Sequence, residues 1–122
     1  MGYESRIYIV EKFDNSYDER YKKVYSIVVS MFNMCKFPRL ASLFSDKPDA
    51  SCYFYADDGN TVMLEDEYGC PLQEAGLEEV IETLERAIIV DKDSYWRIYP
   101  LLSALQAYKL SNMNVVVLHY GY

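Results

Sequence analysis

The stretch Cys52–Leu64, CYFYADDGNTVML, predicts a β-hairpin in the middle of the chain. Two runs rich in aromatic and β-branched residues flank residues 57–60. Asp58-Gly59 between such runs favours a β-hairpin with a type I′ turn, because both central residues accept positive φ. The predicted cross-strand pairs are Tyr55 with Val62 and Phe54 with Met63. Since apolar residues occupy both faces, we expect the hairpin to lie within a sheet and not at a bare edge.

Three further stretches predict strands. Arg6–Phe13 (RIYIVEKF) contains four successive apolar residues, too few for a helix and rich in β-branched types. Tyr21–Met34 predicts a longer strand antiparallel to the first, with some helix as an alternative, and Asn114–Tyr120 (NVVVLHY) predicts a central buried strand. Alternation along the second stretch assigns its side chains to two faces: Tyr25, Ile27, Val29 and Met31 on one, and Val24, Ser26, Val28 and Ser30 on the other.

Helical spacing predicts two main helices. The apolar positions from Leu77 to about Val90 recur at helical spacing, so this stretch predicts an amphipathic helix. Tyr95 to about Leu110 predicts a second helix that is apolar nearly all round, and we expect it to be the more buried of the two. Pro100 either starts its main body or kinks it. Pro38 predicts a short helix further upstream, with a buried stripe of Leu40, Leu43 and Phe44.

A chain of 122 residues has the size of one domain. The order of the predicted elements favours an α+β fold for residues 1–122, with a mostly antiparallel sheet of about five strands and two main helices packed on one face. No apolar run approaches the ~20 residues of a membrane span, and the N-terminus lacks the pattern of a secretory signal. We therefore expect a cytoplasmic protein that makes no membrane contact.

Acidic residues are concentrated in the middle third of the chain. Residues 48–85 hold eleven Asp or Glu and no Lys or Arg, whereas residues 1–47 carry eight bases and six acids and residues 86–122 four bases and two acids. The net charge of −7 disfavours direct nucleic-acid binding, because affinity for phosphates comes from Lys and Arg. Two interpretations stay open: a solvated face that keeps a Tyr-rich protein soluble, or a single surface presented to a basic partner, where it imitates nucleic-acid phosphates.

The sequence holds no pattern typical of an active site or a cofactor site. His119 is the single histidine, which excludes a histidine-rich zinc site, and we expect it to be a packed or surface strand residue. Cys35, Cys52 and Cys70 are spaced 17 and 18 apart, which fits neither a disulfide framework nor a C-x-x-C metal knuckle, so we expect buried free thiols. A weak divalent-cation site near residues 57–67 and a small metal-dependent hydrolase are minor alternatives.

Three segments carry a resemblance to known proteins: MGYESRIYIV at the start, CYFYADDGNT with EDEYG-C-PL in the middle, and VVVLHYGY at the end. Together they resemble small proteins encoded by phages and prophages of Gram-positive bacteria, and the similarity runs nearly end to end. The resemblance implies a phage accessory protein in a bacterial cytoplasm. Such proteins often bind a host protein, and inhibitors of CRISPR nucleases or other defence enzymes are frequently small and acidic. The resemblance supplies no cofactor and no catalytic residue.

We therefore predict a non-enzymatic binding protein, without a cofactor, that inhibits a basic nucleic-acid-binding host protein such as a CRISPR effector. The alternative is a homo-oligomeric accessory protein, for example a homodimer formed through tyrosines and apolar strands. In the leading interpretation carboxylates supply the contact charge and an exposed tyrosine serves as an anchor. The predicted contact residues are Asp57, Asp58, Glu65, Asp66, Glu67, Tyr68, Glu78, Glu82 and Glu85.

Overall fold

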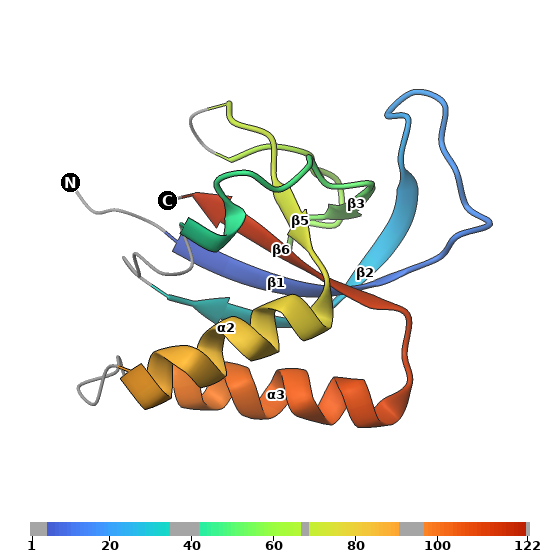
Figure 1. Ribbon diagram of the computed structural model, residues 1–122. Coiled ribbons are helices and arrows are strands. Elements are labelled where there is room, and N and C mark those ends of the chain that lie inside the picture. The colour runs from blue at the N-terminus through green and yellow to red at the C-terminus, as the bar shows by residue number, and fades with distance from the viewer. Residues whose placement is uncertain (1–4, 35–41, 67–68, 91–96, 122) are drawn as a thin grey trace.

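The computed structural model is a six-stranded sheet with two main helices on one of its faces (Figure 1). The structure describes residues 5–34, 42–66, 69–90 and 97–121. Its elements are β1 Ser5–Lys12, β2 Val24–Asn33, β3 Cys52–Tyr55, β4 Val62–Met63, β5 Gln73–Ala75, α2 Leu77–Val90, α3 Ile98–Ser111 and β6 Val115–Gly121, and residues 42–44 are also helical. The predicted α+β class is confirmed. Within the described ranges, neither main helix has the length and apolar composition of a membrane span.

The strand order is β4-β3-β2-β1-β6-β5, so the first and last strands are neighbours inside the sheet, between β2 and β5. β1 pairs antiparallel with β2, as predicted, and with β6, whose pairing runs from Ser5↔Gly121 to Glu11↔Val115. The pairing of β2 with β3 is parallel and consists of Val24↔Cys52 and Tyr25↔Tyr53. The sheet is therefore mixed, with one strand more than the sequence predicts and one parallel pair among antiparallel ones.

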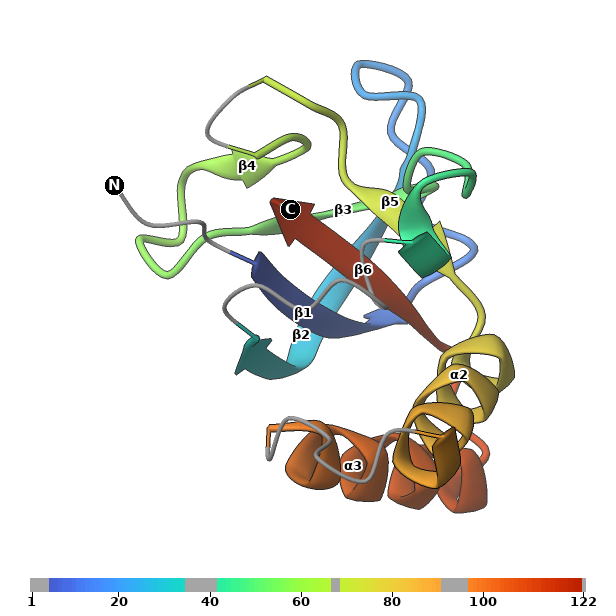
Figure 2. The ribbon, with the colours of Figure 1, turned by 60° about the vertical axis from the view of Figure 1, so that its left-hand side comes forward.

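The sheet curls into half a barrel (Figure 2). Backbone hydrogen bonds connect its two edges. The chain just after β4 pairs with the chain just before β5: Leu72 N–H donates to Leu64 O at 3.2 Å, and Asp66 N–H donates to Cys70 O at 2.8 Å. The chain before β3 joins the same segment, because Ala50 N–H donates to Leu72 O at 2.8 Å. The two edges are therefore tied to each other instead of presenting long unpaired rows of backbone groups.

Side chains alternate along β1 between two cores. Ile7 and Ile9 point toward α2 and α3, where they belong to a helix-side core. Tyr8 and Val10 point into the half-barrel, where they belong to an inner core. The helix-side core also contains Val80, Leu84, Leu101, Leu105 and Val117, and the inner core also contains Cys52, Phe54, Leu72 and Leu118. The sheet thus separates two apolar layers, and both faces of β1 are covered.

A β-bulge in β2 breaks the strict alternation that the sequence predicts for this strand. Ile9 of β1 pairs with Ser30, but the next residue of β1 pairs with Val28, which leaves Val29 as the extra residue. Val29 packs on the helix-side core, whereas Val28 and Met31 line a pocket on the other side of the sheet. The predicted grouping of Val29 with Met31 is therefore wrong, because one inserted residue exchanges the two faces.

The hairpin has the predicted register, but its turn type and its position in the sheet differ from the prediction. The observed pairs are Phe54↔Met63 and Tyr55↔Val62, which confirms the register. Gly59 has a φ of 74°, but Asp58 is not among the described non-glycine residues with positive φ, so the turn is not type I′. Ala56 N–H donates to Thr61 O at 2.8 Å and closes the loop 57–60. β4 is an edge strand, which corrects the expectation of a hairpin inside the sheet.

The two main helices differ in how well the sequence predicts them. α2 has the predicted bounds and buries Val80, Ile81, Leu84 and Ala87. α3 is not the more buried helix, because it buries Ile98, Leu101 and Leu105 but leaves Tyr99 and Leu110 exposed. Pro100 lies in the first turn of α3, where the missing N–H of proline breaks no helical hydrogen bond.

The predicted short helix falls only partly within the described residues. Residues 42–44 are helical, and the Phe44 side chain is fully buried in the helix-side core, where Leu43 packs beside it. Pro38 and Leu40 lie outside the described residues. The part of the prediction that the structure describes is therefore confirmed.

Candidate binding surfaces

The predicted contact residues fall into two groups that lie on opposite sides of the sheet. Figure 2 shows β4 and α2 with β1 and β6 between them. The hairpin acids, around β4, are Asp57, Asp58, Glu65 and Asp66. The helix acids, on α2, are Glu78, Glu82 and Glu85. The described residues therefore form two acidic regions and not the single one expected from the sequence; Glu67 and Tyr68 lie outside the described residues.

Asp58 is engaged by its own loop. Its Oδ1 accepts the backbone N–H groups of Asn60 at 2.8 Å and Thr61 at 2.9 Å, and its Oδ2 accepts the Thr61 hydroxyl at 2.6 Å. The hydroxyl and the two N–H donors lower the pKa of Asp58 from 3.8 to about 2. The carboxylate is charged and exposed, but these contacts make it the residue that closes the hairpin loop.

The remaining hairpin acids differ in their contacts. Asp66 Oδ1 accepts the Cys70 N–H at 3.0 Å, and Asp66 N–H donates to Cys70 O at 2.8 Å, so Asp66 holds the connection between β4 and β5. Glu65 is exposed and forms an isolated bridge with Pro71 through its backbone. Asp57 is exposed at the rim of a pocket. The hairpin acids are therefore partly structural residues of two connecting loops.

The helix acids lie along one exposed side of α2. Glu78, Glu82 and Glu85 follow the i, i+4, i+7 spacing of a single helix face and span about 10 Å along its axis. Lys109 Nζ of α3 lies 3.5 Å from Glu78 Oε1, and both side chains are exposed, so solvent screens this pair. No ion pair reaches Glu82 or Glu85 from the described part of the chain. This side of α2 is therefore negatively charged and open to solvent.

Other carboxylates of the acidic block hold the fold together. Glu79 forms an ion pair with Lys47 and accepts the Gly76 N–H at 3.4 Å. The hydrogen bond from Lys47 lowers the pKa of Glu79. Glu74 Oε1 accepts both the N–H and the hydroxyl of Ser51, at 3.0 and 2.9 Å. These acids attach β5 and the start of α2 to the segment before β3. Some acids of residues 48–85 therefore stabilise the fold, whereas others are exposed and make no such contact.

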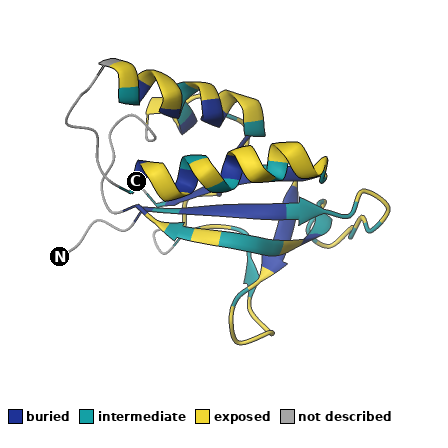
Figure 3. Ribbon diagram, turned by 90° about the horizontal axis from the view of Figure 1, so that it is seen from below, coloured by how far each residue is buried: buried dark blue, intermediate teal, exposed yellow. Residues whose placement is uncertain are grey.

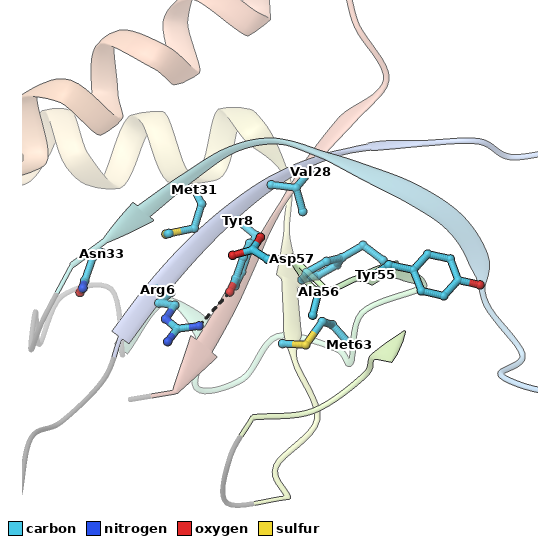
Figure 4. Close-up of a pocket in the computed structure, with 10 residues that line it drawn as sticks. Arg6, Tyr8, Val28, Met31, Asn33, Tyr55, Ala56, Asp57 and Met63 are labelled. Carbon is cyan, nitrogen blue, oxygen red and sulfur yellow. Dashed lines mark hydrogen bonds between the residues drawn. The ribbon is translucent and has the colours of Figure 1, made fainter. Parts of the chain in front are cut away.

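A pocket of about 440 Å³ opens where β2 and β3 diverge (Figure 4). Because these strands share two residue pairs, they separate after Tyr25 and Tyr53 and leave a gap beside the inner core. The apolar wall consists of Val28, Met31, Phe54 and Met63, and the polar rim of Arg6, Asn33 and Asp57. Arg6 Nη1 donates to Tyr8 Oη at 3.1 Å, and the Arg6 guanidinium lies 4.9 Å from the centre of the Tyr120 ring. The volume is in the range of ligand sites.

Sequence reasoning misses this pocket, because it arises from the separation of two strands and not from a local pattern. The described residues that line it include no nucleophile beside a base, and they form a cavity of mixed apolar and polar character. Methionine side chains on opposite walls, Met31 and Met63, give it an adaptable lining.

His119 is a packed strand residue, as the sequence predicts. Its Nε2 lies 3.0 Å from Ser5 Oγ in a buried contact, and its ring stacks on Phe44 with the ring centres 5.0 Å apart. Among the described residues, no group of three His, Cys, Asp or Glu side chains is placed to hold a metal ion.

The cysteines differ in exposure. Cys52 is buried in the inner core as a free thiol, as predicted, and this burial raises its pKa above 9.0. Cys70 is also a free thiol but is exposed, which corrects the prediction. It lies in the connection between β4 and β5, where the chain runs over the surface. Cys35 lies outside the described residues.

Comparisons with known proteins identify no family for this fold or these surfaces. No protein-family model matches the chain, and neither a curated protein nor a solved structure matches it.

Proposed function

We propose that this chain is a non-enzymatic binding protein that inhibits a basic, nucleic-acid-binding host protein through the helix acids. The observation that carries the proposal is the row formed by Glu78, Glu82 and Glu85 on the exposed side of α2. Within the described residues the one ion pair to this row comes from Lys109, at 3.5 Å. Carboxylates at regular spacing on a rigid helix resemble the charged phosphates of a nucleic acid. A groove lined with Lys and Arg would attract such a row.

The helix acids suit this role better than the hairpin acids do. Asp58 and Asp66 accept hydrogen bonds within their own loops, and a partner would have to compete for those carboxylates. Glu82 and Glu85 project from a regular helix that packs on the helix-side core, so little reorganisation is needed when a partner binds. We therefore assign the principal contact to α2, with the hairpin acids as a separate contact to be tested in parallel.

The resemblance to phage and prophage proteins supports an anti-defence role, so CRISPR nucleases are the first candidates for the target. Long-range attraction between the acidic helix and a basic groove would speed association and weaken as salt is added. The net charge of −7 supports this steering, because the rest of the molecule adds no large positive field.

DNA cleavage by purified CRISPR nucleases of Gram-positive bacteria, with and without the protein, tests the proposal. The test variant is Glu82→Lys/Glu85→Lys, which leaves the Glu78–Lys109 contact in place. The matched control is Asp57→Lys/Glu65→Lys, which makes the same charge change on the hairpin. We expect the helix variant to lose inhibition by about 100-fold, in line with the loss of two close charge pairs, and the hairpin variant to retain most of it.

Thermal unfolding establishes that both variants are folded before their inhibition is compared. A folded helix variant with undiminished inhibition would refute the assignment to α2. Equal losses in the two variants would show that overall charge, and not a particular surface, is responsible. A pull-down from a bacterial host extract with the same variants, at low and high salt, extends the search to targets other than nucleases.

A further inference from the structure

The outer side of α3 is less polar than an exposed helix face normally is. A helix that is apolar all round is usually covered on all sides, but the fold covers only one side of α3, where Ile98, Leu101 and Leu105 are buried. On the other side the exposed fraction is 50% for Tyr99 and 88% for Leu110. The sequence of α3 therefore fits a helix that has a further neighbour.

The exposed residues of α3 form a regular stripe. Tyr99, Ser103, Gln106 and Leu110 are spaced four, three and four residues apart, which is the spacing of a seam between packed helices. Ser103 and Ala107, both exposed, are small enough for another helix to approach closely. Lys109 is the one charged residue of α3, and it contacts Glu78 of α2. The stripe itself carries no charge.

The helix acids border this stripe. α2 and α3 pack side by side, and the contact between Lys109 Nζ and Glu78 Oε1 at 3.5 Å shows that the first of the helix acids lies beside α3. Figure 3 shows the exposed sides of both helices on one face of the molecule. Ile89, 77% exposed, continues the row of helix acids at its C-terminal end. The two helices thus combine an uncharged strip, which holds the exposed Tyr99 and Leu110, with an acidic margin, an arrangement like the core and rim of protein interfaces.

Charge decides which occupant fits this surface. A second copy of the chain would bring its own helix acids to the same face. Among the described bases there, Lys109 already contacts Glu78 and Arg97 donates to Asn33 O, which leaves Arg86 to neutralise them. An anionic membrane or a nucleic acid would be repelled by the same carboxylates. A segment with an apolar side and Lys or Arg along its edge would complement both the stripe of α3 and the helix acids. A basic amphipathic helix has this pattern.

We propose that the α2–α3 surface binds a basic amphipathic helix of the partner protein, with Tyr99 and Leu110 as the apolar anchors and the helix acids as the charged margin. This inference rests on the proposed function and names the part of the partner that is recognised. The partner helix lies along the stripe of α3, and its basic side faces α2.

A dye-labelled peptide of Leu and Lys, 14 residues long like α3, serves as the probe, with all Lys on one side of its helix. A second peptide of the same composition, with Lys distributed all round, is the control for net charge. Fluorescence anisotropy measures the affinity of each peptide for the wild type and three variants. Two variants change the proposed surface: Tyr99→Ser/Leu110→Ser on α3 and Glu82→Lys/Glu85→Lys on α2. The third, Ile27→Ser/Met31→Ser on β2, is the matched control, because the Ile27 and Met31 side chains are 44% and 51% exposed.

We expect the amphipathic peptide to bind the wild type and the β2 control equally, and the α3 and α2 variants about tenfold or more weakly. Full affinity in the α3 variant, with a loss in the α2 variant, would overturn the inference and leave the proposed function standing. Equal affinity for both peptides would also overturn it. Light scattering that shows a wild-type dimer and a monomeric α3 variant would assign the stripe to a second copy instead. The proposed function has its own test in the cleavage assay, because the helix variant used there leaves Tyr99 and Leu110 unchanged. Failure of this inference and failure of the proposed function can therefore be told apart.

Discussion

Tyr108 of α3 is hydrogen-bonded to Ser30 of β2, with their hydroxyl oxygens 2.6 Å apart, next to the bulge in that strand. Tyr108 Oη also donates to Val29 O at 3.1 Å. The bulge interrupts the pairing of β2 with β1 at this point, so a side chain from the helix layer satisfies a backbone carbonyl there. The contact attaches α3 to the sheet by a polar link as well as by apolar packing.

Tyr108→Phe tests this link, because it keeps the ring and removes the hydroxyl. We expect the free energy of unfolding to fall by about 1–2 kcal/mol, since Val29 O and Ser30 lose a half-buried partner. Urea unfolding measures the change. Tyr99→Phe is the control on the same helix, because the exposed Tyr99 has no such contact to the sheet and should leave stability unchanged. Equal stability of wild type and Tyr108→Phe would show that water replaces the hydroxyl at no cost.

Asp58 makes the hairpin loop sensitive to acid. Its pKa is about 2 in the folded protein against an ordinary 3.8, so its stabilising effect is complete above about pH 4 and is lost as the pH falls toward 2. Asp58→Asn keeps one acceptor oxygen and removes the charge. We expect the wild type to lose more stability than Asp58→Asn between pH 4 and pH 2. NMR titration of the carboxyl gives the pKa directly, and a value near 3.8 would disprove the hydrogen-bonded loop.

Cys70 and Cys52 should react at very different rates with a maleimide. Cys70 is exposed, whereas Cys52 is buried in the inner core and burial raises its pKa, so little thiolate is available there at neutral pH. We expect Cys70 to be labelled in the folded protein and Cys52 only after unfolding. Peptide mapping by mass spectrometry separates these two from Cys35. Rapid labelling of Cys52 under native conditions would mean that the inner core opens readily.

Phe44 connects the short helix at residues 42–44 to the helix-side core, and its ring stacks on His119. Phe44→Ala should cost about 3–5 kcal/mol, because it leaves a cavity in the core. Ser42→Ala, at an exposed position of the same helix, is the control and should change stability little. Chemical denaturation of the two variants measures the difference, and a small loss for Phe44→Ala would indicate that the core collapses around the gap.

Local patterns predict the parts of this fold that local forces determine. The bounds of α2 follow from the regular spacing of its apolar residues, and the pairing of Phe54 with Met63 follows from the length of the hairpin loop. The turn type does not follow from Asp58-Gly59 alone, because the Asp58 side chain accepts three hydrogen bonds and closes a longer loop. β5 has no apolar pattern of its own: Gln73–Ala75 is a strand because it lies between β6 and the chain before β3.

The surfaces depend still more on tertiary structure. Residues 48–85 form one acidic block in the sequence, but the fold sends the hairpin acids to one side of the sheet and the helix acids to the other. Sequence alone also gives no signal for the pocket between β2 and β3, which exists because their parallel pairing is short. The largely apolar composition of α3 can be read from its sequence, but whether its outer side is covered cannot.

The pairing of β1 with β6 has a consequence for the way this domain is made. Ser5 and His119 touch in the folded protein although 114 positions separate them. A ribosome must therefore deliver nearly the whole domain before the middle of the sheet can assemble, and until then β1 in the nascent chain lacks one of its two neighbours. Acquisition of the native state is accordingly a late event of synthesis, and the apolar residues of β1 stay accessible to chaperones until the last strand emerges.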